Sequence, residues 1–258
     1  DQATGGFEGR VNGRVEFRAV SHRFAEAEVD TLAQVSIVAE PGQTIALVGR
    51  SGSGKTTLVN LIARLIDSTD GDVLLNEVNI RQIAPTELWT RIGLAPQKPY
   101  LFSGSVASNL RYGKADASDE EMWNALAIAQ AESFVRDMPG SLEATIAQGG
   151  SNVSGGQRQR LAIARVLIRK PAIYIFDDSF SALDLVTDAS LRTALIPHIA
   201  SSVTVIVGQR ISTIRHANQI MVLEDGQIVG LGTHEQLSQS CATYQEIVAS
   251  QASQEGDD

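Results

Sequence analysis

The sequence predicts an α/β fold with a mainly parallel sheet, a small antiparallel β part near the N-terminus and a helical insertion. Three short apolar runs, at residues 44–48, 172–176 and 203–207, have the composition of strands buried on both faces. Helical patterns separate these runs, and strands that alternate with helices form parallel sheets. From about residue 98 to residue 165 the pattern is helical, which predicts the insertion.

Alternating apolar and polar residues predict the other strands. Residues 15–20 alternate like a half-buried strand near the N-terminus, and residues 35–39 form another candidate. Near the other end, Asp225-Gly226 separates two alternating runs, which is a β-hairpin signal. Ser118 followed by Glu121 is a capping box that starts a helix. Further strands are expected at residues 71–75 and 91–95, and helices at residues 58–62 and after Thr233.

Composition excludes several classes of protein. A net charge of −9 over 258 residues disfavours a nucleic-acid partner. No apolar run approaches the roughly 20 residues of a membrane span. Cys241 is the only cysteine, so an intrachain disulfide is excluded, and the four histidines lack the spacing of metal ligands. The chain starts with Asp1 rather than Met, so we expect a piece of a longer protein whose other part could contain membrane segments.

The segment from Gly49 to Thr56 fits the phosphate-binding pattern G-x-x-x-x-G-K-[ST] at every position. It lies between a predicted strand and a predicted helix, the setting that the pattern needs; a chance Gly/Ser-rich match is the alternative. Its backbone N–H groups and the helix N-terminus favour phosphate, Lys55 is placed to reach the β- and γ-phosphates, and Thr56 to ligate Mg²⁺. The nucleotide-binding residues predicted here are Gly49, Arg50, Ser51, Gly52, Ser53, Gly54, Lys55, Thr56 and Thr57.

An apolar strand that ends in Asp177-Asp178 is the second element of this site. Beside a phosphate-binding loop it has the form of a Walker B motif. Asp177 is then expected to hold Mg²⁺, directly or through water, and Asp178 to orient the attacking water. The pattern alone is weak, because many strands end in acidic turn residues.

The stretch Val153-Ser154-Gly155-Gly156-Gln157 resembles the L-S-G-G-Q signature of ATP-binding cassette (ABC) ATPases, with Val153 in place of Leu. The resemblance extends from about residue 14 to residue 249. It implies a P-loop NTPase core, ATP and Mg²⁺ as cofactors, and a head-to-tail dimer in which Ser154, Gly155, Gly156 and Gln157 face the nucleotide of a second domain.

The same resemblance assigns further residues. Phe24 is expected to stack on adenine, although it could equally belong to the core, and Gln97 to contact Mg²⁺ and sense a transmembrane partner. Residues 96–106 and 232–235 resemble exporters, which implies a transmembrane domain as partner and a place at the cytoplasmic face of the membrane. The expected parts are a linker at 1–13, core parts at 14–97 and 166–249, a helical subdomain at 98–165 and a disordered tail at 250–258.

Two positions depart from the family. Asp178 stands where the family has Glu, and its carboxylate is withdrawn by about one carbon–carbon bond, ~1.5 Å. Gln209 stands where the family has His, and an amide cannot become a cation. Together with an intact signature, these changes suggest the weak half of a heterodimeric exporter, in which Asp178 is the residual base, Gln209 the γ-phosphate contact and Lys55 the phosphate ligand. A fully hydrolytic homodimeric exporter and an ATP-occluding regulatory module remain the alternatives.

Overall fold

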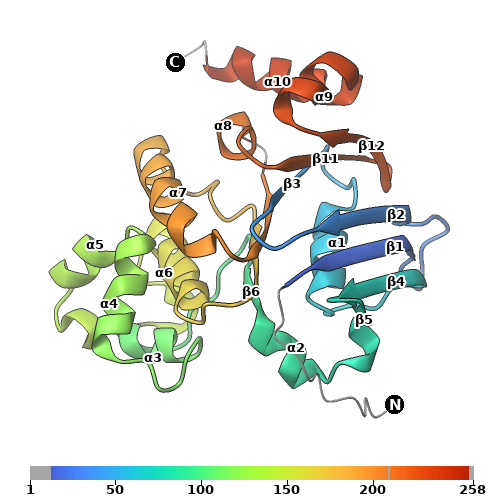
Figure 1. The fold of residues 1–258 in the computed structure, drawn as a ribbon. Coiled ribbons are helices and arrows are strands. Elements are labelled where there is room, and N and C mark those ends of the chain that lie inside the picture. The colour runs from blue at the N-terminus through green and yellow to red at the C-terminus, as the bar shows by residue number, and fades with distance from the viewer. Residues whose placement is uncertain (1–12, 209, 256–258) are drawn as a thin grey trace.

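The computed structural model describes residues 13–208 and 210–255, with side chains described as far as Gln251. The linker expected at 1–13 therefore lies outside the described residues except for Gly13, and so does Gln209. Figure 1 shows two sheets on one side of the molecule and a group of helices on the other. The fold class expected from the sequence is confirmed.

The larger sheet has six strands in the order β12-β11-β3-β10-β9-β6. Strands β11, β3, β10, β9 and β6 pair in parallel, and only β12 joins antiparallel, through the hairpin predicted at Asp225-Gly226. All residues of β9 and β10 are buried, as their unbroken apolar runs predict. The strands are β3 Thr44–Val48, β6 Ile92–Ala95, β9 Ile173–Asp177, β10 Val203–Val207, β11 Gln219–Glu224 and β12 Gln227–Gly232.

A second, antiparallel sheet has the order β2-β1-β4-β5. Its strands are β1 Val15–His22, β2 Leu32–Ala39, β4 Asp70–Leu75 and β5 Val78–Asn79. Helix α1 (Lys55–Ile62) shares one hydrophobic cluster with both sheets, so the phosphate-binding loop that precedes it is held between them. Helix α2 (Pro85–Arg91) follows this sheet, after a short 3₁₀ turn at Ile80–Gln82, and leads into β6.

The helical block lies against the other side of the parallel sheet (Figure 1). Ser118 begins α4 with the predicted capping box, in which the Ser118 hydroxyl and the Glu121 carboxylate each bond the other's backbone. Helix α7 contains Pro197 and ends two residues later. The elements are β7 Gly104–Ser105, α3 Val106–Arg111, α4 Asp119–Ile128, α5 Glu132–Asp137, β8 Thr145–Ile146, α6 Gly155–Leu167, α7 Leu185–Ile199 and α8 Ile211–Ile214, with 3₁₀ turns at Ser141–Glu143 and Gln148–Gly150.

The C-terminal end differs from the expectation of one helix and a disordered tail from residue 250. Two helices follow the hairpin, α9 (His234–Ser240), capped by Thr233, and α10 (Ala242–Glu255). Tyr244 is fully buried in a third hydrophobic cluster, and Ile247 and Val248 pack against that cluster. This anchoring explains why α10 continues past residue 250; residues 256–258 lie outside the described part. Among the described residues, no helix is long and apolar enough to span a membrane.

Candidate functional site: a phosphate-binding cavity

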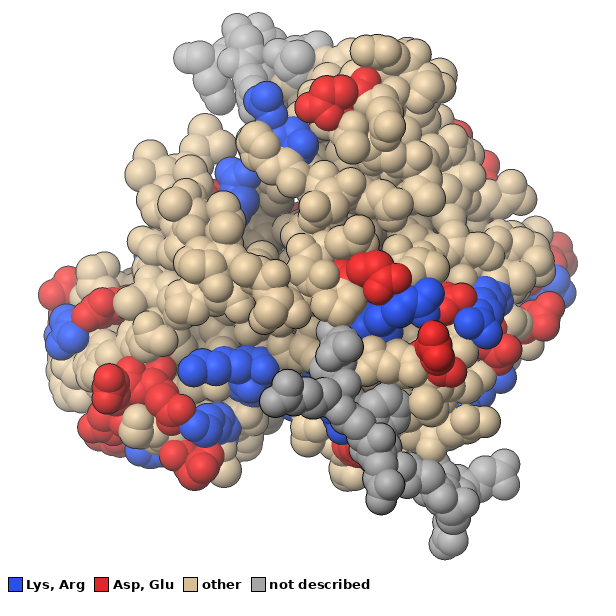
Figure 2. Space-filling model, in the orientation of Figure 1, with Lys and Arg blue, Asp and Glu red and all other residues tan. Residues whose placement is uncertain are grey.

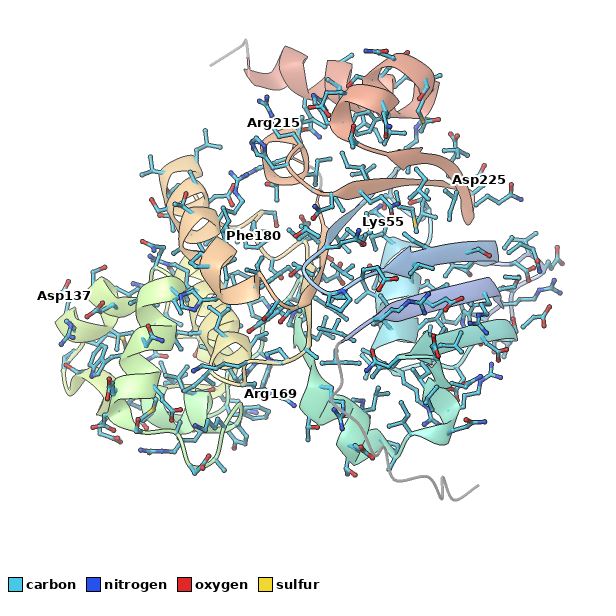
Figure 3. All side chains as sticks on the ribbon, viewed as in Figure 1. Lys55, Asp137, Arg169, Phe180, Arg215 and Asp225 are labelled. Atoms are coloured by element: carbon cyan, nitrogen blue, oxygen red, sulfur yellow. The ribbon has the colours of Figure 1, made fainter. Side chains whose placement is uncertain are left out.

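A cavity of about 470 Å³ opens at the carboxyl ends of the parallel strands β3, β9 and β10. In Figure 3, Lys55 lies near the centre of the molecule, where these strands meet the start of α1. Most of the predicted site residues line it, although they come from three separate stretches of the chain. They are Gly49, Arg50, Ser51, Gly52, Gly54, Lys55, Thr56, Thr57, Gln97, Asp177 and Asp178.

Glycines at two positions allow the backbone of this loop to turn tightly. At Gly49, with φ +150°, a Cβ would lie 2.2 Å from the carbonyl oxygen of Leu223. Gly54, the N-cap of α1, has φ +102°, and a Cβ there would lie 2.6 Å from Cδ2 of Leu32. No side chain caps the start of α1. Its first N–H groups are therefore free to bind phosphate, as at other helix N-termini that carry partial positive charge.

The ammonium group of Lys55 forms hydrogen bonds with the phosphate-binding loop that precedes it. Nζ donates to the carbonyl oxygens of Gly49 and Arg50, both at 2.8 Å, and contacts Oγ of Ser53 at 3.3 Å. Burial lowers the pKa of Lys55, while the charges of Asp177 and Asp178 act to raise it. Ser53 does not line the cavity but supports Lys55. A phosphate group can replace these carbonyls as the partner of Lys55.

Asp177 and Asp178 present two carboxylates to the same cavity. Burial raises the pKa of Asp177; the neighbouring charge of Asp178 adds to this rise, and Lys55 opposes it. Asp178 has a left-handed backbone, φ 46°, which Asp tolerates better than most residues. Its carboxylate accepts a hydrogen bond from Nε2 of Gln97 at 3.1 Å, although the two residues are 81 positions apart.

These residues fit Mg²⁺ bound together with a nucleotide. Mg²⁺ in such sites takes one or two protein oxygens and completes its shell with phosphate oxygens and water. The exposed hydroxyl of Thr56 and the carboxylate of Asp177 are such oxygens, and both line the cavity. Among the described residues, no three His, Cys, Asp or Glu side chains form a metal cluster.

Two groups of predicted residues lie away from this cavity. Phe24 does not line the described cavity; it is 48% exposed and packs edge-on against His22, with ring centroids 4.7 Å apart. The signature residues lie at the start of α6. There, Ser154 caps the helix by accepting from the backbone N–H of Gln157 at 3.2 Å, and Gln157 Oε1 accepts from the Ser154 N–H at 2.9 Å. A Cβ on Gly155 would meet no atom within 4 Å, so this helix start is open.

No sequence pattern predicted several of the residues that line the cavity. Thr31 and Gly208 lie in loops, and Ile247, Ser250 and Gln251 lie on α10. The polar composition of residues 250–258 suggested disorder, and no local pattern indicates that a helix would return across the phosphate-binding loop. Tertiary contacts, among them the burial of Tyr244, hold α10 there.

Comparison with known proteins decides the family. The family model for ABC transporters matches residues 32–181. The chain belongs to the ABC transporter family. As an ABC-type domain it binds ATP, and proteins of this family are ATPases in general.

Relatives of known sequence and structure agree. An uncharacterized ABC transporter ATP-binding protein of Mycobacterium bovis is 48% identical over 94% of this chain and 42% of its own length. An ATP-dependent lipid A-core flippase of Bordetella avium is 40% identical over 91% of this chain and 40% of its own length. A bacterial Atm1-family ABC exporter with ATP bound has a TM-score of 0.89 and 30% identity, over 93% of this chain and 42% of the exporter chain. The chain thus spans about two fifths of the length of these relatives.

Proposed function

We propose that this domain binds Mg·ATP, pairs head to tail with a second ABC domain, and powers an exporter, with slow hydrolysis at its own phosphate-binding loop. The observation that carries the proposal is the position of Asp178. Its carboxylate lies at the cavity edge and is engaged by Gln97 at 3.1 Å. A Glu there would extend about 1.5 Å further, and a misplacement of about 1 Å can cost on the order of 10²-fold in rate.

The second domain is expected to supply the signature surface, because the signature of this chain does not line its own cavity. The signature helix start at Ser154 is open and does not line the cavity of its own chain. A partner whose signature covers this cavity, and whose cavity receives Ser154, would use both surfaces. Since the signature here is intact while Asp178 and Gln209 depart from the family, we expect a non-identical partner that carries Glu and His at those positions.

The exposed aromatic residues at the start of the helical block are the proposed docking surface for the transmembrane part. Tyr100, Phe102 and Tyr112 are between 42% and 62% exposed and contact one another through their rings. The Gly149 N–H donates to the Leu101 carbonyl at 2.9 Å, which joins this patch to the 3₁₀ turn at Gln148–Gly150. This assembly would place the domain at the cytoplasmic face of a membrane.

A nucleic-acid partner is not proposed. Figure 2 shows Lys and Arg interspersed with Asp and Glu on the face in view, with acidic residues gathered over the helical block. The net charge of −9 points the same way, because binding to nucleic acid depends on neutralising phosphates with Lys and Arg.

Phosphate release tests the proposal. We would compare the wild-type chain with Asp178→Glu/Gln209→His, at concentrations high enough for self-pairing. In a self-pair both sites have an intact signature, so these two positions alone limit the chemistry. We expect the wild type to be nearly silent and the double variant to release phosphate on the order of 10²-fold faster.

Two other results would favour a different function for this domain. Brisk hydrolysis by the wild type would favour a homodimeric exporter in which Asp178 and Gln209 suffice. ATP-dependent dimerisation without phosphate release in either form would favour a regulatory module that occludes ATP. Lys55→Met, which removes the phosphate ligand, is the control for release that does not come from this site.

A further inference from the structure

The C-terminal helix α10 is anchored at its start, and residues further along it line the phosphate-binding cavity. At the anchor, Tyr244 is fully buried and its hydroxyl lies 2.9 Å from Nδ1 of His234. The Thr243 hydroxyl donates to Oε2 of Glu224 at the end of β11, at 3.0 Å. These contacts fix the direction of α10, which crosses above the sheet toward α8 in Figure 1.

Three residues of α10 line the same cavity as the phosphate-binding loop. They are Ile247, Ser250 and Gln251. On the same helix, Glu246 forms an ion pair with Arg50 at 2.8 Å. This pair is exposed, with 71% of the Arg50 side chain and 64% of the Glu246 side chain accessible, so salt screens it and it contributes little energy. It nevertheless joins α10 to the phosphate-binding loop.

Gln251 connects α10 to the start of α8. Its Oε1 accepts a hydrogen bond from the backbone N–H of Ile211, the first residue of α8, at 2.7 Å. The N-cap residue of α8, Arg210, gives no side-chain cap. An uncapped helix start leaves N–H groups without partners. Gln251 therefore supplies from 40 residues away the cap that the local sequence lacks.

Other contacts hold the residues on either side of position 209. Gly208 lines the cavity, and its N–H donates to the Leu47 carbonyl of β3 at 3.3 Å. On the other side, the Arg210 guanidinium donates to the carbonyls of Leu183 at 3.1 Å and Ser181 at 3.2 Å. Residue 209, the proposed γ-phosphate contact, stands in the chain between these two held positions.

We propose that Gln251 is a positioning residue for the site: it caps α8 across the cavity and so holds Ile211 and Arg210, the residues that follow position 209 in the sequence. The inference rests on the proposed function for the identity of the nucleotide. The hydrogen bond between Ile211 and Gln251 does not depend on that function. It assigns to the C-terminal helix a role in catalysis through Ile211, without contact between Gln251 and the reacting atoms.

Hydrogen exchange of the Ile211 amide tests the contact directly. Gln251→Met keeps the shape of the side chain and removes the acceptor, whereas Gln251→Glu keeps an acceptor oxygen. We expect the Ile211 amide to exchange about 2- to 10-fold faster in Gln251→Met, the range that one hydrogen bond confers. Exchange should return toward the wild-type rate in Gln251→Glu.

Gln245→Met is the matched control, since Gln245 lies on the same helix, outside the cavity, and donates to the Ser238 carbonyl. This variant should leave exchange at Ile211 unchanged. Equal exchange of Ile211 in wild type and Gln251→Met would overturn the proposal, and so would equal acceleration in Gln251→Met and Gln245→Met.

The catalytic consequence is measured in the Asp178→Glu/Gln209→His background. Adding Gln251→Met should lower kcat by about 2- to 10-fold and leave the KM for ATP within about 2-fold, because the ground-state phosphate contacts remain. If kcat/KM falls only because KM rises, or if kcat does not change, the positioning role is refuted. If the background variant has no turnover at all, the proposed function fails, while the exchange experiment still decides whether Gln251 holds Ile211.

Discussion

Arg192→Met is the most informative stability test, because it removes one partner of a buried ion pair within α7. Asp188, in the first turn of α7, is completely buried. Nη2 of Arg192 binds its Oδ2 at 3.0 Å, and Nη1 of Arg192 donates to the carbonyl of Ser212 in α8. The other carboxylate oxygen, Oδ1, has no hydrogen-bond partner among the described residues. Arg192 is therefore the principal compensation for the Asp188 charge.

The expected cost follows from this geometry. Removing one partner of a buried pair and leaving the other charged costs about 3–5 kcal/mol. Natural domains have a free energy of unfolding of about 5–15 kcal/mol, so this loss is a large share of the total. For a chain of this size, it corresponds to a fall in Tm of roughly 6–20 °C. Met keeps much of the packing of the Arg stem, so the change reports mainly on charge.

A double-mutant cycle with urea unfolding measures the pair. Asp188→Asn removes the buried charge, so Asp188→Asn/Arg192→Met should be more stable than Arg192→Met by at least about 1 kcal/mol. If the double variant is as unstable as Arg192→Met alone, the reasoning from an uncompensated carboxylate is wrong. The matched control is Arg136→Met, whose partner Glu132 is exposed and which should cost about 0–1 kcal/mol.

The pH dependence gives a second check. Burial raises the pKa of Asp188, and Arg192 acts to lower it. A carboxyl group with a raised folded-state pKa destabilises the fold only where the unfolded chain has lost its proton, so the penalty grows as the pH rises above about 4. Without Arg192 the pKa rises further. The difference between Arg192→Met and wild type should therefore be smaller at pH 5 than at pH 8.

Two further outcomes are expected. Gly54→Ala forces a side chain into a left-handed position 2.6 Å from Leu32, so it should lower the free energy of unfolding by about 1–3 kcal/mol and weaken ATP binding, measured by urea unfolding and nucleotide titration. Gly155→Ala, whose Cβ meets no atom within 4 Å, is its control and should keep full stability. For Glu16, hydrogen bonds from Arg18 and Arg14 lower the pKa to about 2. Its contribution to stability should be complete above pH 4.5 and lost as the pH falls toward 2; a carboxyl titration by NMR that gives an ordinary pKa would contradict this.

Much of the site could be predicted from local sequence. The glycines and Lys55 of the phosphate-binding loop are contiguous, and their chemistry depends on spacing alone. The carboxylates at 177–178 follow an apolar run that could only be a buried strand. Because parallel strands end at one edge of a sheet, these residues from separate strands meet there. The cap at Ser118 and the hairpin at Asp225-Gly226 were equally local, since each uses contacts within four residues.

Contacts between distant residues were decided only by the tertiary structure. The hydrogen bond from Gln97 to Asp178 spans 81 positions, and the one from Ile211 to Gln251 spans 40. Neither has a sequence pattern, because each depends on how two elements pack rather than on the propensity of either. The polar end of α10 favours disorder by composition, yet burial of Tyr244 places it over the nucleotide cavity. The sequence by itself determined which chemistry this protein carries; the packed fold decided which side chains hold that chemistry in position.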